Sequence, residues 1–374
     1  MNFDITEEQQ LVKDSVTRFV QENYELEARL AISGANPGYS EDHWKTFADL
    51  GWLGLPFSEE DGGFGGTAID TMLIFEEFGK GLVVEPYLAS VVLGGGALRH
   101  GANPAQKGEI ITGLAAGELK LALAYAEEQS RFDLHDVTTS ARADGDNYII
   151  NGAKSMVLNA ETADHIIVSA RTSGGQVDKS GISLFLIPRE TAGLKVEGFP
   201  TVDGLRAAEI SFNDLSVGAE NLIGTKGSGY ETLNATINDG ILAIAAEALG
   251  SMEVLYKDTV AYTQEREQFD HPMSDFQVVQ HRLVEMFMEY EQCKSLLYRA
   301  TLEQAQNAPT AQRTIHALKH MVGKAGYFIG ENAVQLHGGM GMTEELRVAH
   351  YFKRLLVVDS QFGNADHHLE LFAA

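Results

Sequence analysis

Hydrophobic positions recur at helical spacing through the first third of the chain. Thr6 is followed by Glu7 and Glu8, acidic residues that favour the first turn of a helix because the helix dipole is positive there. Apolar residues then repeat every three or four positions, at Leu11, Val12, Val16, Phe19 and Val20. Glycines cluster at 51–66 without the lysine of a phosphate loop, so we expect an irregular helix connection there. The pattern predicts an N-terminal α-helical domain over residues 1–117.

The middle of the chain changes to the period of β-strands. Asp144-Gly145 precedes a β-rich run and Asn151-Gly152 follows it, and both pairs are typical of hairpin turns. Further β-rich runs lie at 165–170, 182–187, 194–198 and 208–212. Because no helical pattern separates these runs, they predict an antiparallel β-barrel or sandwich over residues 118–225 rather than a nucleotide-binding parallel sheet.

Long helices return in the last third of the chain. No Gly or Pro interrupts residues 276–308. Apolar side chains there alternate by three and four, at Phe276, Val279, Leu283, Met286, Tyr290, Cys293, Leu297 and Ala300. This seam predicts an antiparallel four-helix bundle over residues 226–374, with Met286 and Cys293 in its core. The expected fold class is therefore α+β, with a helical domain, a β-domain and a helical bundle in that order.

Composition and charge exclude several classes of partner. The 374 residues carry a formal net charge of −25, which argues against nucleic acid and against an anionic membrane surface. The acidic start lacks the basic and then apolar pattern of a secretory signal, and no apolar run reaches the length of a membrane helix. Cys293 is the only cysteine, so no internal disulfide can form. These features together predict a cytoplasmic location.

Four separated segments resemble the acyl-CoA dehydrogenase family. They are ADLGWLGLPFSEEDGGFGG at 48–66, DGDNYIINGAKSMVLNA at 144–160, EREQF at 265–269 and QLHGGMGM at 335–342. The third is similar to the family's E-R-x-x-F-G motif, with Asp270 in place of the glycine, and the fourth to its Q-x-x-G-G-x-G segment. The order and spacing of these segments agree over essentially the whole chain.

The resemblance implies a cofactor, a reaction and partners. Family members use FAD to remove two hydrogens from an acyl-CoA thioester, pass electrons to an electron-transferring flavoprotein, and usually assemble as tetramers. The segments EEQSRFD at 127–133 and DSQFGNADHHL at 359–369 are most similar to the small subunit of heteromeric bacterial enzymes. Those enzymes act on pimeloyl-CoA-like or steroid side-chain thioesters, which implies a role in lipid or steroid degradation.

Family members commonly bind FAD across a subunit interface, and this chain retains the residues that reach a neighbour's FAD. The resemblance implies that Arg266 meets the pyrophosphate, that Phe269 packs nearby and that Gln335 donates a hydrogen bond. Gly338 and Gly339 would let the backbone come close to the cofactor. Read without the resemblance, Arg266 could equally form a surface ion pair with a neighbouring glutamate, and the two glycines could end a helix.

The residues that would hold FAD in the chain's own pocket are altered. The family's T-E-P-G-A-G-S-D loop aligns with residues 126–133, where Ala126 replaces the threonine and Phe132 replaces the serine. The family's W-I-T-N run aligns with residues 156–159, so that Met156 and Leu158 stand where a tryptophan and a threonine face the flavin. Together these changes predict that no flavin ring sits in this subunit's own pocket.

The catalytic carboxylate is also missing from its usual place. The glutamate of the family's Y-E-G-T motif aligns with Phe362, and the alternative position on the first bundle helix aligns with Gly240. Asp239 and Glu247 are the two remaining candidates for the base, although each can equally be a structural or solvated carboxylate. His367 and His368 are adjacent and diverge on a helix, so we expect no metal site.

Three functions fit this sequence. In the first, the chain is one subunit of a heteromeric acyl-CoA dehydrogenase and contacts the FAD of a paralogous partner subunit. In the second, it is a self-sufficient homo-oligomeric dehydrogenase with Asp239 or Glu247 as an unusual base. In the third, it is a flavin-free assembly or binding protein on the same scaffold.

Overall fold

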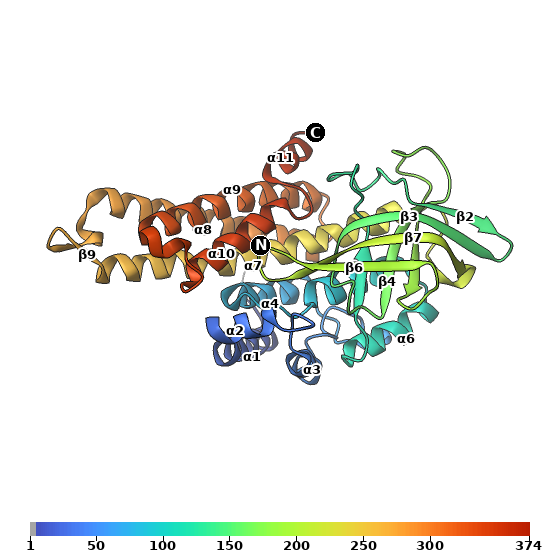
Figure 1. Cartoon of the computed structure of the whole chain (residues 1–374), viewed down its shortest axis with the longest axis horizontal. Coiled ribbons are helices and arrows are strands. Elements are labelled where there is room, and N and C mark those ends of the chain that lie inside the picture. The colour runs from blue at the N-terminus through green and yellow to red at the C-terminus, as the bar shows by residue number, and fades with distance from the viewer. Residues whose placement is uncertain (1–4) are drawn as a thin grey trace. The chain divides into compact units, whose positions relative to one another are not determined.

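The computed structural model describes residues 5–374, which fold into two compact units. The described part of Met1–Ala31 forms unit 1 together with Thr67–Val83 and Ile241–Ala374. Unit 2 contains Ile32–Gly66 and Val84–Gly240. Two helices, α2 (Leu26–Gly34) and α7 (Gly229–Glu265), have residues in both units. The chain's helical, β-rich and helical regions confirm the predicted α+β class (Figure 1).

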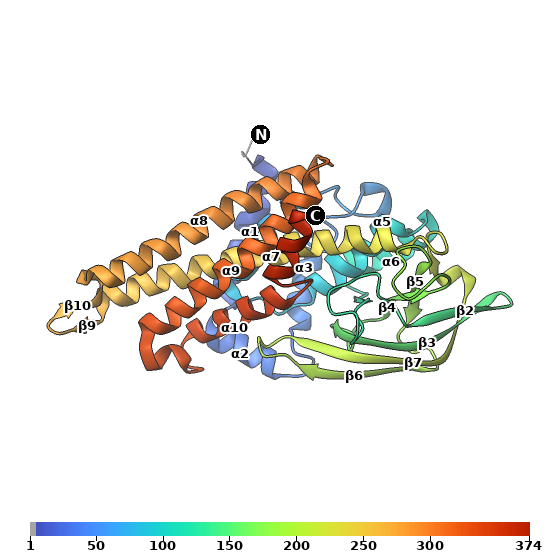
Figure 2. The same ribbon diagram turned by 90° about the horizontal axis from the view of Figure 1, so that it is seen from above.

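Unit 1 is helical. Its remaining helices are α1 (Glu7–Asn23), α4 (Ala68–Gly81), α8 (Gln277–Ala305), α9 (Ala311–His337), α10 (Arg347–Ser360) and α11 (Ala365–Ala373). The predicted start of α1 is confirmed, because Thr6 is the N-cap and its hydroxyl accepts a hydrogen bond from the Gln9 amide. Leu11 was expected on the buried face but is 69 % exposed. Figure 2 shows α7, α8 and α9 as long neighbouring helices of the bundle.

The predicted seam of α8 is largely confirmed. Its buried residues include Val279, Met286, Tyr290, Cys293, Leu297 and Ala300, whereas Phe276 and Leu283 are half-buried. Two glycines set a second contact inside unit 1, between α4 and α7. A Cβ on Gly79 would lie 1.9 Å from the Glu247 carbonyl oxygen, and one on Gly250 would lie 2.0 Å from the Glu76 carbonyl oxygen. Each helix therefore needs glycine where the other helix's backbone crosses it.

Unit 2 is built on one sheet, which has eight strands within the described residues. The strands are β1 (Leu121–Ala124), β2 (Ser140–Asp144), β3 (Asn147–Leu158), β4 (His165–Arg171), β5 (Ile182–Pro188), β6 (Leu194–Pro200), β7 (Arg206–Gly218) and β8 (Leu222–Ile223). They pair in the order β6-β7-β3-β2-β4-β5-β8, and β1 pairs with β4. Shorter helices of this unit include α3 (Glu41–Asp49), α5 (Gly96–Gly101), α6 (Pro104–Ala115) and the π-helix η2 (Leu88–Gly95). The glycine-rich stretch at 51–66 is irregular, as predicted.

Two predictions for the sheet are wrong in detail. The sheet is mixed rather than antiparallel, because β1 runs parallel to β4. Asn151-Gly152 is not a hairpin turn either, since it lies inside the continuous strand β3, where the register against β7 shifts between Ile150 and Gly152. Gly152 has a φ of 144°, and a Cβ there would lie 2.6 Å from Thr139 Oγ1. The glycine therefore lies at a register shift between β3 and β7 and leaves room for Thr139, the residue before β2.

Candidate functional site

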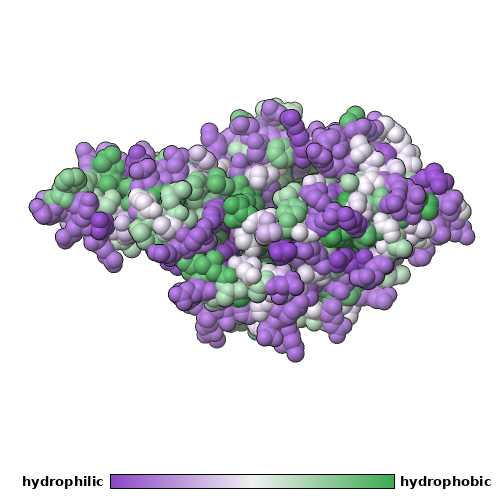
Figure 3. All heavy atoms as spheres, viewed as in Figure 1, coloured by the Kyte–Doolittle hydropathy of each residue, from purple (hydrophilic) through white to green (hydrophobic). Residues whose placement is uncertain are grey.

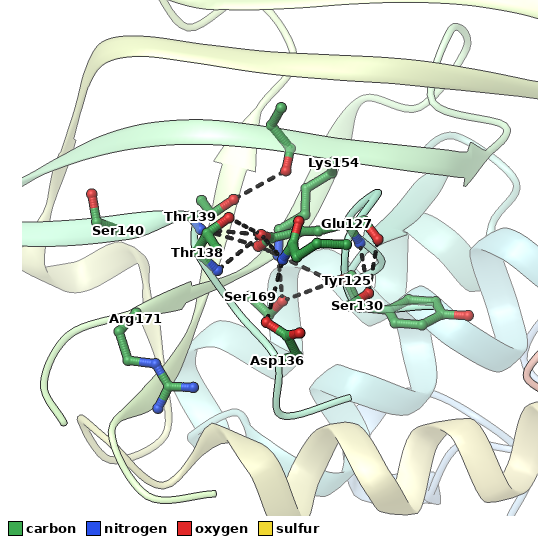
Figure 4. Close-up of polar contacts among 12 residues, drawn as sticks. Tyr125, Glu127, Ser130, Asp136, Thr138, Thr139, Ser140, Lys154, Ser169 and Arg171 are labelled. Atoms are coloured by element: carbon green, nitrogen blue, oxygen red, sulfur yellow. Dashed lines mark hydrogen bonds and ion pairs between the residues drawn. The ribbon is translucent and has the colours of Figure 1, made fainter. Parts of the chain in front are cut away.

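A buried ion pair lies at the base of the loop between β1 and β2. Lys154, on β3, places Nζ 2.7 Å from Oε1 of Glu127 (Figure 4). The same ammonium donates to the Tyr125 carbonyl at 3.1 Å and to Ser169 Oγ at 2.9 Å. All three donor positions of the ammonium are thus used inside unit 2.

Glu127 ties the two ends of this loop together. Its Oε2 accepts hydrogen bonds from the Thr138 amide and the Gln129 side-chain amide, both at 2.9 Å, and from the Thr138 hydroxyl. Its Oε1 accepts from the Thr139 amide at 3.1 Å. Burial acts to raise the pKa of Glu127, but the charge of Lys154 and these hydrogen bonds outweigh it and lower the pKa to about 2. The loop is therefore closed by a carboxylate that is ionised at neutral pH.

The hydroxyl of Ser130, in the loop at residues 126–133, is already used in hydrogen bonds within the loop. Ser130 Oγ donates to the Glu127 carbonyl at 2.9 Å and accepts from the Glu127 amide at 3.1 Å. Phe132 stands two residues further on and is half-buried. The Ser130 hydroxyl thus closes the loop on itself, and Phe132, which aligns with the family's serine, has no hydroxyl to donate.

The bulge of β3 that follows Lys154 exposes the apolar side chain of Met156 and is hydrogen-bonded to the carboxylate of Glu209. Met156 has a φ of 54° and is 52 % exposed. Oε1 of Glu209 accepts from the Ser155 hydroxyl at 2.9 Å and from the Met156 amide at 3.4 Å. Leu158 is half-buried and pairs with Ala207. The amide of the bulge is thus capped by an anion, and the side chains of Met156 and Leu158 have no hydrogen-bond donor.

Asp239, the first candidate base, belongs to a charged cluster of unit 2. Its Oδ2 lies 2.5 Å from Nη2 of Arg99 and 2.7 Å from Nε2 of His100. Arg99 is itself fixed, because its Nη1 donates to the Pro56 carbonyl at 3.0 Å. A carboxylate that already accepts from a guanidinium and an imidazole is a poor proton acceptor, since its negative charge is stabilised by its neighbours.

Glu247, the second candidate base, lies inside unit 1 and is paired with Arg354. The two guanidinium donors Nε and Nη2 reach the two carboxylate oxygens at 2.6 and 2.7 Å. The side chains of Arg354 and Glu247 are 3 % and 8 % exposed. This bidentate geometry uses the carboxylate fully, and it satisfies a charge that an apolar helix segment would otherwise leave unpaired.

Phe362, the residue that the sequence aligned with the family's glutamate, lies in the loop between α10 and α11. Its φ is 61°, a left-handed conformation that is strained for a bulky residue. The buried Lys319 donates to the carbonyls of Asp359 at 2.8 Å and of Gly363 at 2.5 Å, and His368 Nε2 donates to the Phe362 carbonyl at 3.0 Å. Three carbonyls in or next to the loop are thus hydrogen-bonded, but the side chain at 362 cannot take a proton.

The five predicted cofactor contacts lie at the surface of unit 1. Arg266, Gln335, Gly338 and Gly339 are exposed, and Phe269 is 87 % exposed. Among residues 5–374, none forms a hydrogen bond or ion pair with the Arg266 guanidinium. A Cβ on Gly338 or Gly339 would meet nothing within 4 Å. Gly338 needs glycine for its backbone, with φ 63° and ψ −143°, but nothing within the described chain requires glycine at 339.

Other apolar side chains are exposed on the same unit. Figure 3 shows hydrophobic patches among the hydrophilic side chains over the C-terminal helices. The exposed large hydrophobic residues of this region include Val278, Val284, Phe287, Met288, Tyr327, Met340 and Met342. Exposed apolar surface of this kind is typical of a face that contacts another molecule.

Comparison with known proteins identifies the family. Profiles of the acyl-CoA dehydrogenase N-terminal, middle and C-terminal domains match residues 6–118, 122–215 and 227–374. The chain is 31 % identical over 371 residues to the "Probable acyl-CoA dehydrogenase YngJ" of Bacillus subtilis, with 98 % of this chain and 97 % of that relative covered. This chain belongs to the acyl-CoA dehydrogenase family. It is thus a member of a family of oxidoreductases.

Solved structures with the acyl-CoA dehydrogenase fold are similar over the whole chain. The structure described as "PigA with FAD and proline" has a TM-score of 0.92 and 28 % identity, and the match covers 100 % of this chain and 98 % of that one. The ChsE4-ChsE5 complex from Mycobacterium tuberculosis gives a TM-score of 0.90 at 24 % identity, covering 100 % and 98 % of the two chains. At that identity the second similarity supports the fold alone.

Within residues 5–374 no three His, Cys, Asp or Glu side chains are grouped to hold a metal ion. His368 instead contacts His316, with 3.0 Å between their Nδ1 atoms, and lies against His367. In the same part of the chain, no helix is both long and apolar enough to span a membrane.

Sequence reasoning missed the partners of the charged residues. Lys154 is separated from Glu127 by 27 residues and Arg354 from Glu247 by 107, so no local pattern joins either pair. One signal was available for each pair. Lys154 falls inside the segment at 144–160 that resembles the family's β-domain hairpin, and Glu247 falls in an apolar helix segment. A charge that becomes buried in such a place requires a partner.

Proposed function

We propose that this chain is one subunit of a heteromeric, FAD-dependent acyl-CoA dehydrogenase. In this proposal it contributes Arg266, Phe269, Gln335, Gly338 and Gly339 to FAD that a paralogous partner subunit holds. Bound FAD supplies a hydride acceptor for the α,β-dehydrogenation of an acyl-CoA thioester. The observation that carries the proposal is a contrast within the chain. These five residues are exposed and Arg266 has no partner among residues 5–374, whereas the loop at 126–133 and the bulge at Met156 use their polar groups in the chain's own hydrogen bonds.

The exposed residues of unit 1 fit a dinucleotide. Arg266 presents a planar cation whose paired donors match the oxygens of a pyrophosphate, and no described residue neutralises it. Gly339 has neither a positive φ nor a neighbour within 4 Å of a Cβ position. Close approach of a ligand would account for a glycine that the chain's own packing does not require.

Two features of unit 2 support the part of the proposal in which the chain's own loop holds no flavin. The Ser130 hydroxyl is used by the loop itself, and Glu209 occupies the amide of the bulge at Met156. The side chains of Met156 and Leu158 offer no donor to a flavin ring. We therefore derive no catalytic step in this pocket.

The proposed division of labour also assigns the catalytic base to the partner. Phe362 has no ionisable group, and both remaining candidates are paired with cations, Asp239 with Arg99 and Glu247 with Arg354. A base must be within reach of the substrate's α-carbon and able to accept its proton. Neither paired carboxylate suits that role, which disfavours the self-sufficient enzyme.

Several finer features belong to the same proposal. The electron acceptor would be an electron-transferring flavoprotein, the assembly a tetramer, and the acyl group a lipid or steroid side chain. A cytoplasmic location is compatible with the lone, buried Cys293, which has no disulfide partner in the sequence.

The proposal is tested by changing this subunit alone within the assembled enzyme. The complex is purified with wild-type partner and with either wild-type or Arg266→Ala chain, and the Kd for FAD is measured by flavin fluorescence. Loss of charge-assisted hydrogen bonds should raise the Kd roughly 10-fold or more. Arg299→Ala is the matched control, because that exposed arginine is paired with Glu303 on α8. An unchanged Kd for the Arg266 variant would overturn the proposed contribution to the partner's FAD.

A further inference from the structure

An aromatic stack joins the two segments that carry the proposed cofactor contacts. Tyr262, in the last turn of α7, stacks on His337, the last residue of α9. The ring centroids are 4.3 Å apart and the ring planes are inclined by 23°. Both residues belong to unit 1, and neither was singled out by sequence reasoning.

The orientation of the His337 ring is fixed by a hydrogen bond. Nδ1 lies 2.8 Å from the Ala333 carbonyl oxygen, which can only accept, so Nδ1 carries the proton. The imidazole is also buried, with 6 % of its surface exposed. The ring is therefore a fixed platform at the end of α9, and Tyr262 rests on it.

Tyr262 in turn fixes the backbone of Arg266. The Arg266 amide donates to the Tyr262 carbonyl at 2.8 Å, and the Arg266 carbonyl accepts from the Met273 amide at 2.8 Å. The segment between them forms the hairpin of β9 (Glu267–Gln268) and β10 (His271–Pro272), which carries Phe269 at its tip. The position of Arg266 and of this hairpin is thus set from the stacked end of α7.

His337 likewise adjoins the glycine segment at 338–341. Gly338 follows it directly, in a conformation open only to glycine, and the Gly338 amide donates to the Gln335 carbonyl. Gly341, three residues later, packs against His337, because a Cβ there would lie 3.1 Å from the His337 Cβ. His337 therefore adjoins the glycine segment at two places, since it precedes Gly338 in the chain and its Cβ lies against Gly341.

We propose that Tyr262 and His337 are positioning residues that hold Arg266 and the glycine backbone at 338–339 in register for one dinucleotide pyrophosphate. This inference rests on the proposed function and deepens it. Neither ring needs to touch the cofactor. Loosening the stack moves a cation on one segment relative to amide groups on another, and residues that support a site in this way commonly change its affinity.

The test is the affinity of the assembled heteromeric enzyme for FAD. Tyr262→Leu and His337→Leu each remove the stack, and each should raise the Kd about 3- to 10-fold, as expected for a lost aromatic pair. The double variant should be no worse than the more affected single variant, because both changes remove the same contact. Tyr262→Phe keeps a ring on His337 and should bind FAD like wild type.

Stability provides the matched control. Tyr256→Leu, on the same helix, removes aromatic contacts with Phe287 and Tyr290, and it should lower the Tm without changing the Kd. A merely structural role for Tyr262 and His337 would give the same result, a lower Tm with a wild-type Kd, and would overturn the inference. Should Tyr262→Leu prevent assembly, His337→Leu tests the same stack from the other helix, and Tyr262→Met tests it with a less severe change.

Arg266→Ala separates this inference from the function on which it rests. If that variant raises the Kd but the leucine variants do not, only the positioning role fails. If none of the three raises the Kd, the proposed contribution of this chain to the partner's FAD fails as well.

Discussion

Nζ of Lys154 lies 2.7 Å from Oε1 of Glu127, with both side chains almost fully buried. Desolvation lowers the pKa of Lys154 to about 8, although the Glu127 charge acts in the opposite direction. The pair holds the β1–β2 loop against β3. Glu127 also accepts hydrogen bonds from the Thr138 and Thr139 amides, so it joins the two ends of the loop.

Removing one member of this pair should be costly. We predict that Lys154→Met lowers the free energy of unfolding by about 3–5 kcal/mol, because Glu127 keeps a buried charge without its cation. Urea unfolding of the chain checks this value. Lys195→Met is the matched control, since the exposed pair of Lys195 and Glu197 should contribute less than about 1 kcal/mol. Equal losses in the two variants would contradict a special role for the buried pair.

The same pair predicts a pH dependence of stability. The folded-state pKa of Glu127, about 2, is below the ordinary value of 4.5. Between these values the unfolded chain binds more protons than the folded chain, so the contribution of Glu127 is complete above about pH 4.5 and is lost as the pH falls. Unfolding free energies of wild type and Glu127→Gln should therefore converge as the pH is lowered from about 5 to about 3. A difference that stays constant over that range would refute this assignment.

Glu247 and Arg354 give a prediction that separates structure from catalysis. Arg354→Met should lower the free energy of unfolding by about 3–5 kcal/mol, because it leaves Glu247 as a buried, unpaired charge. Arg347→Met, which removes a more exposed bidentate pair with Asp258, is the control and should cost less. In the heteromeric enzyme, Glu247→Gln should lower the Tm and leave kcat within about twofold, because a structural carboxylate takes no proton from substrate. Loss of kcat with unchanged Tm would restore Glu247 as the base.

The hairpin tip carries strain that a glycine should relieve. Phe269 and Asp270 have φ values of 56° and 64°, the geometry of a type I′ turn, in which glycine is favoured at the second position. We predict that Asp270→Gly raises the free energy of unfolding by roughly 0.5 kcal/mol. Glycine relieves the strain of the left-handed conformation, and part of this gain is offset because glycine adds conformational entropy to the unfolded chain. Asp270→Ala should lower it instead, because alanine tolerates the left-handed conformation less well than aspartate does. Chemical unfolding of the three proteins side by side measures both effects.

The sequence predicted the features of the fold that depend on local periodicity. The cap at Thr6 and the seam from Val279 to Ala300 follow from residues that are neighbours on one helix. Asn151-Gly152 was misassigned because its local preference suits a turn, whereas β3 continues and the glycine instead gives room to Thr139. An Asn-Gly pair can form a turn or lie at an irregularity within a strand. The neighbouring strands decide between the two, and they are too far away in the sequence to be included in a local pattern.

Features of the candidate site could be predicted from the sequence only where the family resemblance or the identity of one residue was enough. Phe362 has no ionisable group, which the sequence alone shows. The cations beside Asp239 and Glu247 come from segments 140 and 107 residues away, so only the folded chain brings them together. The stack of Tyr262 on His337 is of the same kind, because two helix ends meet there through tertiary packing.

The central claim is most directly tested by the FAD content of this chain expressed and purified alone. The protein should be folded, with a cooperative thermal transition, and should contain close to no FAD by absorbance, and added FAD should leave its Tm unchanged. Near one FAD per chain, with a Tm that rises on adding FAD, would contradict the account and favour a self-sufficient dehydrogenase that binds FAD in its own altered pocket.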